Sequence, residues 1–134
     1  MDSSVLLRII LGEPRRLDIW RSITVPVSSE LIRLECLRTV DRARIRLGLA
    51  DRQVARHRAD ILEACAAFTL VPLEHAILER AAQPFPTLIG SLDAIHLASA
   101  IYAREQLRDL AVATHDEELA MAARAEGFTT HGVA

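Results

Sequence analysis

The stretch VATHDEELAMAARAEGF, residues 112–128, has the pattern of a buried strand that runs into an amphipathic helix. Its apolar run stops at Thr114, and the acidic residues 116–118 follow at the mouth of the alanine-rich helix. Capping is one explanation, because Thr114 and Glu117 stand at capping-box spacing and carboxylates in a first turn suit the helix dipole. Whether Asp116 also belongs to a functional site depends on the rest of the chain.

The same alternation of short β-prone runs and longer helical runs extends over the whole chain. Strands separated by helices predict a parallel sheet with helices on both faces, and sites in such sheets form beyond the carboxyl ends of the strands. Asp116 lies just past one such end. We expect strands at 22–27, 68–73 and 110–114, and a last strand or a tail at 128–133. We expect helices from about Val5 and at 28–47, 51–67, 74–82, 92–107 and 116–127, and a proline-rich loop at 83–91.

The composition fits a single domain over residues 1–134. Hydrophobic residues make up 51% of the chain and aromatic residues only 4%, which suits helices packed on a sheet. No apolar run approaches the roughly 18 residues of a membrane span, and no basic region precedes the first apolar stretch, so we expect neither a span nor a signal peptide. Cys36 and Cys65 lie inside helical patterns, and we expect buried free thiols in a reducing cytoplasm.

A glutamate occupies an unusual position in the predicted helix at 28–47. At 100° per residue, Glu35 falls on the apolar arc that also carries Leu31 and Cys36. A carboxylate in an apolar stripe is unfavourable unless it is paired, protonated or bound to a cation. Its alternative partner is Arg38, one turn further along the helix.

Two further acids stand at predicted helix starts. Asp93 is the only acid in the first three turns of LDAIHLASAIYA, a helix so aliphatic that it must be largely buried, and Asp2 precedes the apolar run that begins at Val5. Each could simply answer the helix dipole or cap its helix. His96 shares a face with Asp93, and we interpret it as a hydrogen-bonded core residue rather than a metal ligand.

The four acids share one pattern, since each stands at a helix start or in a buried stripe and none belongs to a surface charge run. Four carboxylates in one pocket would repel one another, and a hard cation would make the arrangement stable. All-oxygen ligation indicates Mg²⁺ or Mn²⁺ rather than zinc. These ions also take phosphate oxygens as ligands, so the pattern indicates phosphoryl-transfer chemistry. The four are Asp2, Glu35, Asp93 and Asp116.

The stretches DSSVLLRIILGEP, VSSELIRLECLR, LDAIHLASA and VATHDEELAMAARAEGF together resemble the signatures of the PIN-domain family, especially the VapC-like toxin ribonucleases of toxin–antitoxin pairs. The resemblance covers nearly the whole chain, in the family's order. It implies a three-layer α/β/α sandwich on a parallel sheet. It also implies an acidic quartet that binds Mg²⁺ or Mn²⁺ and cleaves single-stranded or looped RNA.

The family's site residues transfer to this chain one by one. The aspartate of the Asp-Ser/Thr-Ser motif falls on Asp2, that of Leu-Asp-Ala on Asp93, and that of Thr-x-Asp on Asp116. The helix glutamate falls on Glu35 rather than Glu30, because it precedes a small apolar residue. Ser4 and Thr114 are supporting hydroxyls, and Glu117 is expected to cap the helix behind Asp116.

One departure from the family concerns the first strand. Family members have several apolar strand residues before the first aspartate, and here only Met1 precedes Asp2. Either the start lies upstream, or the first strand is truncated. A truncated strand would leave Asp2 poorly anchored.

The resemblance implies that the metal-held quartet activates a water for hydrolysis of an RNA phosphodiester. The formal net charge of −2 argues against a general nucleic-acid coat, yet a local patch could hold the backbone. Alternatively, this patch is an ordinary solvated face. Its arginines surround the predicted helix junction in DRARIRLGLADRQVARHR: Arg42, Arg44, Arg46, Arg52, Arg56 and Arg58.

The resemblance further implies an antitoxin partner that presents an arginine to the carboxylates, and a homodimer. Nothing in the acids separates RNA from DNA, so a DNA nuclease or another Mg²⁺ phosphohydrolase is an alternative function. A non-catalytic module that only pairs with a partner protein is a third interpretation. The presence of all four acids argues against it.

Overall fold

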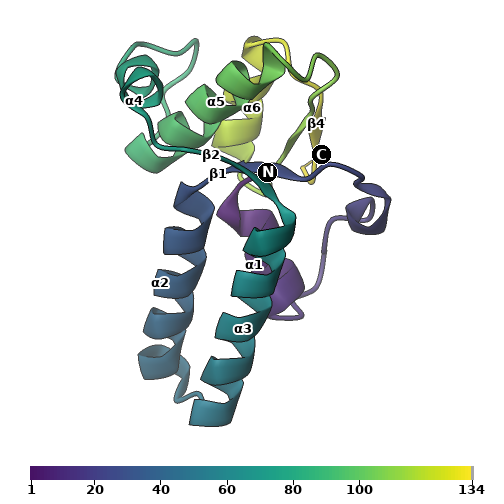
Figure 1. The fold of residues 1–134 in the computed structure, drawn as a ribbon, viewed down its shortest axis with the longest axis vertical. Helices are drawn as coiled ribbons and strands as arrows, with labels where there is room; N and C mark the ends of the chain where they lie inside the picture. Colours follow the sequence, from purple (N-terminus) through teal and green to yellow (C-terminus); the bar gives the residue numbers. More distant parts are fainter. Residues whose placement is uncertain (134) are drawn as a thin grey trace.

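A computed structural model describes residues 1–133. Helices and short parallel strands alternate along the chain, which confirms the α/β class (Figure 1). The elements are α1 (Ser3–Ile10), the 3₁₀ turn η1 (Trp20–Ser22), β1 (Val27–Ser29), α2 (Leu31–Leu47), α3 (Asp51–Ala67), β2 (Thr69–Val71), α4 (His75–Ala81), α5 (Ser91–Arg104), β3 (Val112–Ala113), α6 (Glu117–Ala125) and β4 (Thr130–His131).

The parallel sheet is small and lies in two parts. β1 pairs with β2 and β3 pairs with β4, each in parallel. The first two residues connect the parts, because the Met1 ammonium donates to the Val27 carbonyl at 2.8 Å and the Asp2 amide donates to the Ala113 carbonyl at 3.2 Å. Residues 1–2 therefore bridge β1 and β3 through these hydrogen bonds.

The prediction of a strand at 22–27 is wrong in position. Residues 20–22 form η1, and the strand instead occupies Val27–Ser29, all three of which are buried. Pro26 lacks an amide proton and can contribute only its carbonyl, which accepts from the Thr69 amide at 2.9 Å. Burial and pairing with β2, rather than local β propensity, therefore decide where the strand lies.

The helix predicted at 28–47, with Ser28 or Ser29 as its cap, begins later, because α2 starts at Leu31 with Glu30 at its N-cap. Ser29 still supports the helix start, since its hydroxyl accepts from the Leu31 amide at 3.2 Å. Ser28 instead donates to the Met1 carbonyl at 2.6 Å. Both serines are thus used to join β1 to its neighbours.

Helices α2 and α3 form a long hairpin that extends away from the strands (Figure 1). Its interior is apolar and contains Ile32, Val40 and Ile61, together with Cys36 and Cys65. Both cysteines are free and buried, as predicted. Burial raises the pKa of Cys36 to about 12, so this thiol stays protonated and behaves as a core residue.

A second core forms where α5 and α6 cover β3. Leu97, Val112, Leu119 and Phe128 are buried there, and Ala122 and Ala123 let α6 approach closely. This packing brings the N-terminal ends of α5 and α6 to the edge where β3 ends. None of the helices formed by residues 1–133 has the length and apolar character that a bilayer span requires.

Candidate functional site

Three of the four predicted acids contribute to the electrostatic environment of the fourth, Asp93. Asp2 precedes α1, Glu35 lies in α2, Asp93 in the first turn of α5, and Asp116 at the N-cap of α6. The pKa of Asp93 is raised from 3.8 to about 6, mainly by burial and then by the charges of Asp116, Asp2 and Glu35, while His96 opposes the shift. The charges of all three other acids therefore act on the Asp93 carboxyl.

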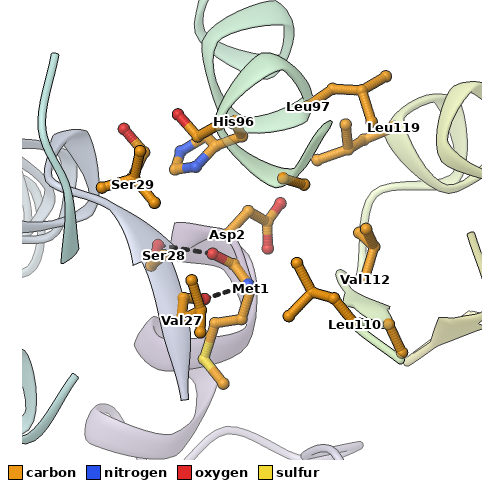
Figure 2. A pocket seen from close by; sticks show the side chains of 14 residues that line it. Met1, Asp2, Val27, Ser28, Ser29, His96, Leu97, Leu110, Val112 and Leu119 are labelled. Carbon is orange, nitrogen blue, oxygen red and sulfur yellow. Dashed lines mark hydrogen bonds between the residues drawn. The ribbon is translucent and has the colours of Figure 1, made fainter. Parts of the chain in front are cut away.

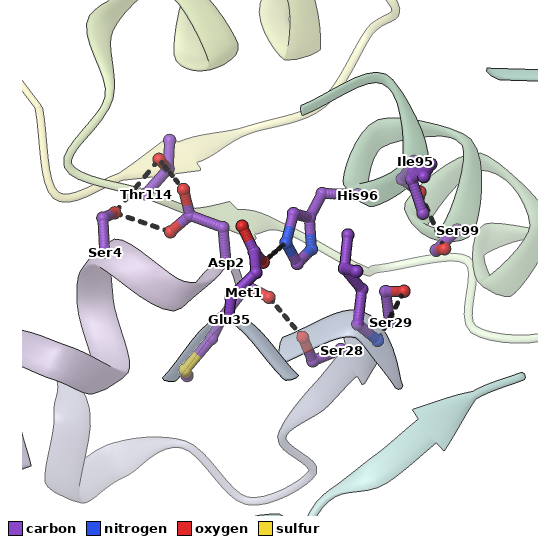
Figure 3. A network of polar contacts seen from close by, with 11 residues as sticks. Met1, Asp2, Ser4, Ser28, Ser29, Glu35, Ile95, His96, Ser99 and Thr114 are labelled. Atoms are coloured by element: carbon purple, nitrogen blue, oxygen red, sulfur yellow. Dashed lines mark hydrogen bonds and ion pairs between the residues drawn. The ribbon is translucent and has the colours of Figure 1, made fainter. Parts of the chain in front are cut away.

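Asp2 is held by both of its carboxylate oxygens. Ser4 donates its hydroxyl to Oδ1 at 2.6 Å, and Thr114 donates to Oδ2 at 2.7 Å (Figure 3). The residue is 5% exposed. It occupies the N-cap of α1 but makes no side-chain capping bond, so the alternative that Asp2 merely caps this helix is wrong. The expectation that a reduced first strand leaves Asp2 poorly anchored is also contradicted.

Asp116 does cap its helix. Its Oδ1 accepts from the Leu119 amide at 2.9 Å, and its own amide donates to the Thr114 hydroxyl at 3.0 Å. The expectation that Glu117 caps α6 is therefore wrong, because Asp116 has that position and Glu117 lies exposed in the first turn. Capping engages Oδ1, and a carboxylate has a second oxygen, so capping and membership of the site are compatible.

Glu35 pairs with His96 and not with Arg38. The Nε2 atom of His96 is hydrogen-bonded to Oε1 of Glu35, whereas Arg38 pairs with Asp41 at 3.1 Å. His96 is thus the buried, hydrogen-bonded residue that the sequence predicted, but its partner had no sequence signal. Glu30, by contrast, is exposed, and its Oε1 accepts from a backbone amide outside the acidic site.

A small cavity of about 30 Å³ lies beside Asp2, between β1 and β3 (Figure 2). Met1, Ser28, Ser29 and His96 line its polar side, with Leu97, Val112 and Leu119 among its apolar walls. This volume admits about one or two water molecules and no nucleotide.

The donor set fits a hydrated hard cation. Within residues 1–133, no three His, Cys, Asp or Glu side chains form a ready-made metal cage. Each of three carboxylates already accepts a hydrogen bond from the protein: Asp2 from a hydroxyl, Glu35 from His96, and Asp116 from a backbone amide. Mg²⁺ typically binds through one or two carboxylates and keeps several waters, which suits carboxylates that are close enough to repel but not clustered around one point.

The predicted arginine patch lies at the far end of the α2–α3 hairpin. Arg44 and Arg46 are nine and eleven residues beyond Glu35, or roughly 14–17 Å along the helix axis. Arg44 pairs with Asp51 at 3.0 Å. The structure does not bring these side chains to the acidic site; the other members are Arg42 on α2 and Arg52, Arg56 and Arg58 on α3.

Other basic residues adjoin the site. Arg15, Arg16 and His115 line a surface hollow of about 450 Å³. The backbone amide of His115 donates to Ser4 at 2.9 Å, and Ser4 in turn donates to Asp2. Sequence reasoning missed this hollow, although two adjacent arginines follow the helical run of the opening motif.

Comparisons with known proteins agree with this arrangement. The PIN domain family profile matches residues 1–125. The chain is 31% identical over 137 aligned positions to "Ribonuclease VapC47" of Mycobacterium tuberculosis (strain CDC 1551 / Oshkosh), an alignment that covers 97% of this chain and 93% of that protein. No solved structure matches the chain. The family match over residues 1–125, the relative that is 31% identical over nearly the whole chain, and the parallel α/β core show that the chain belongs to the PIN domain family.

Proposed function

We propose that this PIN-domain protein is a Mg²⁺- or Mn²⁺-dependent endoribonuclease that hydrolyses RNA phosphodiesters. The observation that carries the proposal is the grouping of the acids. Thr114 is hydrogen-bonded to both Asp2 and Asp116, and the charges of Asp116, Asp2 and Glu35 add to burial in raising the pKa of Asp93. Such mutual repulsion is relieved by a divalent cation. The relative named as a ribonuclease supports RNA as the substrate class.

The residues of the site would have different roles. Asp2, Glu35 and Asp93 would hold the ion, and Asp116 would orient the attacking water or help to hold a second ion. A bound divalent ion polarises a phosphate oxygen and lowers the pKa of water, which supplies the nucleophile at neutral pH. Ser4 and Thr114 keep the Asp2 carboxylate in place through their hydroxyl bonds.

We further propose that the protein is the toxin of a type II toxin–antitoxin pair in the cytoplasm. Its cognate antitoxin would neutralise it by placing an arginine among the carboxylates, and the toxin would act as a homodimer. The support is the VapC name of the relative together with an acidic site that a basic side chain would complement. Growth arrest on expression, relieved by co-expression of the neighbouring gene, would test the pair.

Cleavage of matched RNA and DNA tests the activity itself. We expect RNA to be cut only when Mg²⁺ or Mn²⁺ is present, and Asp93→Asn to remove cleavage while the protein stays folded. Asp41→Asn is the matched control, because Asp41 lies in α2 and forms only an exposed ion pair with Arg38. Preferential cleavage of DNA would indicate the alternative nuclease, and calorimetry that detects no Mg²⁺ binding would indicate a non-catalytic module.

A further inference from the structure

We propose that His96 is a positioning residue that holds Glu35 in the geometry needed to bind the divalent ion. The inference rests on the proposed metal-dependent function, and it assigns a role to a side chain outside the acidic quartet. His96 lies three residues after Asp93, on the same side of α5. Its imidazole reaches across to Glu35, which belongs to α2.

The contact joins the two helices that supply Glu35 and Asp93. His96 Nε2 is bonded to Glu35 Oε1, and the two side chains are 5% and 18% exposed. Figure 3 shows the Glu35 carboxylate directed at the imidazole. A glutamate has three side-chain torsions and loses their freedom whenever it binds an ion. A fixed partner removes that freedom before the ion arrives.

The direction of the bond follows from the chemistry of the two groups. In the ionised form that binds a cation, the Glu35 carboxylate can only accept, so Nε2 of His96 then carries the proton and donates it. The bond occupies Oε1 of Glu35, and the second oxygen is the one available to a cation. His96 itself is therefore no ligand through Nε2, because that atom already serves Glu35.

The other ring nitrogen has no protein partner. His96 Nδ1 is buried and has no hydrogen-bond partner among residues 1–133, and the ring lines the small cavity beside Asp2. That cavity has room for a water that could bond to Nδ1. Within the described residues, the imidazole is therefore hydrogen-bonded to the Glu35 carboxylate and to no other protein group.

Mn²⁺ affinity provides a readout that is separate from catalysis. Partners of metal ligands typically contribute ten- to a hundredfold to metal affinity, so we expect His96→Ala to weaken Mn²⁺ binding at least about tenfold by calorimetry. His96→Gln keeps an amide donor and should restore part of that loss. Ser99→Ala is the matched control, because Ser99 is buried on the same helix and donates only to the Ile95 carbonyl.

A double-mutant cycle separates action through Glu35 from general loosening of the site. We expect His96→Ala to cause no further loss of Mn²⁺ affinity in a Glu35→Ala protein. With Mn²⁺ saturating, His96→Ala should leave the RNA KM within twofold of the parent value. Circular dichroism establishes whether each variant is folded. If His96→Ala does not fold, the same measurements are made on His96→Gln.

Unchanged Mn²⁺ affinity in folded His96→Ala would overturn the positioning role, as would an equal loss with and without Glu35. A parent protein that binds Mn²⁺ with the expected coupling but cuts no RNA would overturn the proposed function and leave the positioning role standing. A parent protein that binds no Mn²⁺ would overturn both.

Discussion

Thr114 donates its hydroxyl to Oδ2 of Asp2 at 2.7 Å, across a sequence separation of 112 residues. Thr114 is fully buried and also accepts from the Asp116 amide at 3.0 Å. One hydroxyl therefore ties the first acid of the site to the last. This bond and the one from Ser4 fix the Asp2 side chain, while its amide donates to the Ala113 carbonyl.

Removing this hydroxyl tests the tie between the two ends of the site. Thr114→Val keeps the shape of the side chain but leaves Asp2 Oδ2 and the Asp116 amide without their partner. We expect the free energy of unfolding to fall by about 1–3 kcal/mol in urea titrations. Thr39→Val is the control, because its hydroxyl accepts only from Arg42 on the surface of the α2–α3 hairpin. Equal losses in the two variants would contradict the role assigned to Thr114.

Asp93 predicts a pH-dependent stability. Its pKa is raised from 3.8 to about 6, first by burial and then by the neighbouring acids. The folded state therefore holds a proton that the unfolded state has already released. The stability from this proton is fully present below about pH 4 and is lost as the pH rises through about 6. Thermal melts without metal should show this loss in the parent and not in Asp93→Asn.

Mg²⁺ should counteract the same repulsion. The ion competes with the proton on Asp93, so the rise in melting temperature on adding Mg²⁺ should be larger above pH 6 than below it. Asp93→Asn should reduce the response at high pH. A parent protein whose melting temperature ignores Mg²⁺ at pH 7.5 would be incompatible with a cation at this site.

Substitutions at Glu30 and Glu35 test which of the two glutamates belongs to the acidic site. Glu35 faces the buried His96, whereas Glu30 is exposed and accepts only from the Leu73 amide at 3.0 Å. We expect Glu35→Gln to abolish RNA cleavage and Glu30→Gln to keep at least half of it. Comparable loss in both variants would show that the motif has been misplaced by five residues.

Local patterns predicted most elements, because helix periodicity and turn residues act over a few positions. The α3 helix begins at Asp51 as predicted, and the acid at each helix mouth could be read in the same way. The position of the strand at Val27–Ser29 could not be predicted from local patterns, because pairing with β2 decides it. The partner of Glu35 was equally hidden, because His96 lies 61 residues away and no local rule pairs them.

Substitution of two different pairs of arginines tests which surface binds RNA. Arg15 and Arg16 line the hollow that adjoins Asp2 through His115, whereas Arg44 and Arg46 lie at the far end of the hairpin. We expect Arg15→Ala with Arg16→Ala to weaken RNA binding and to lower its salt dependence by about two phosphate contacts. The corresponding pair at Arg44 and Arg46 should have a smaller effect. The reverse order, in filter-binding titrations without Mg²⁺, would favour the hairpin patch.

The hollow beside Met1 leads to a prediction about adding residues before it. A hollow of about 590 Å³ borders Met1, Val27 and Leu110, and the backbone edges of β1 and β3 face it. Burial lowers the pKa of the Met1 amine, which donates to the Val27 carbonyl. An amide in its place would make the same bond without a buried charge.

We therefore expect an extension of about five β-prone residues before Met1 to raise the melting temperature and tighten Mg²⁺ binding. A glycine–serine extension of equal length is the control, since it removes the charge without filling the hollow. The lowered pKa of the Met1 amine also predicts that the shorter protein gains stability as the pH rises towards 8.0, and both extended proteins should lack this gain. If the β-prone extension matches its control in melting temperature and Mg²⁺ affinity, the contacts of Asp2 with Ser4 and Thr114 are sufficient to anchor the site.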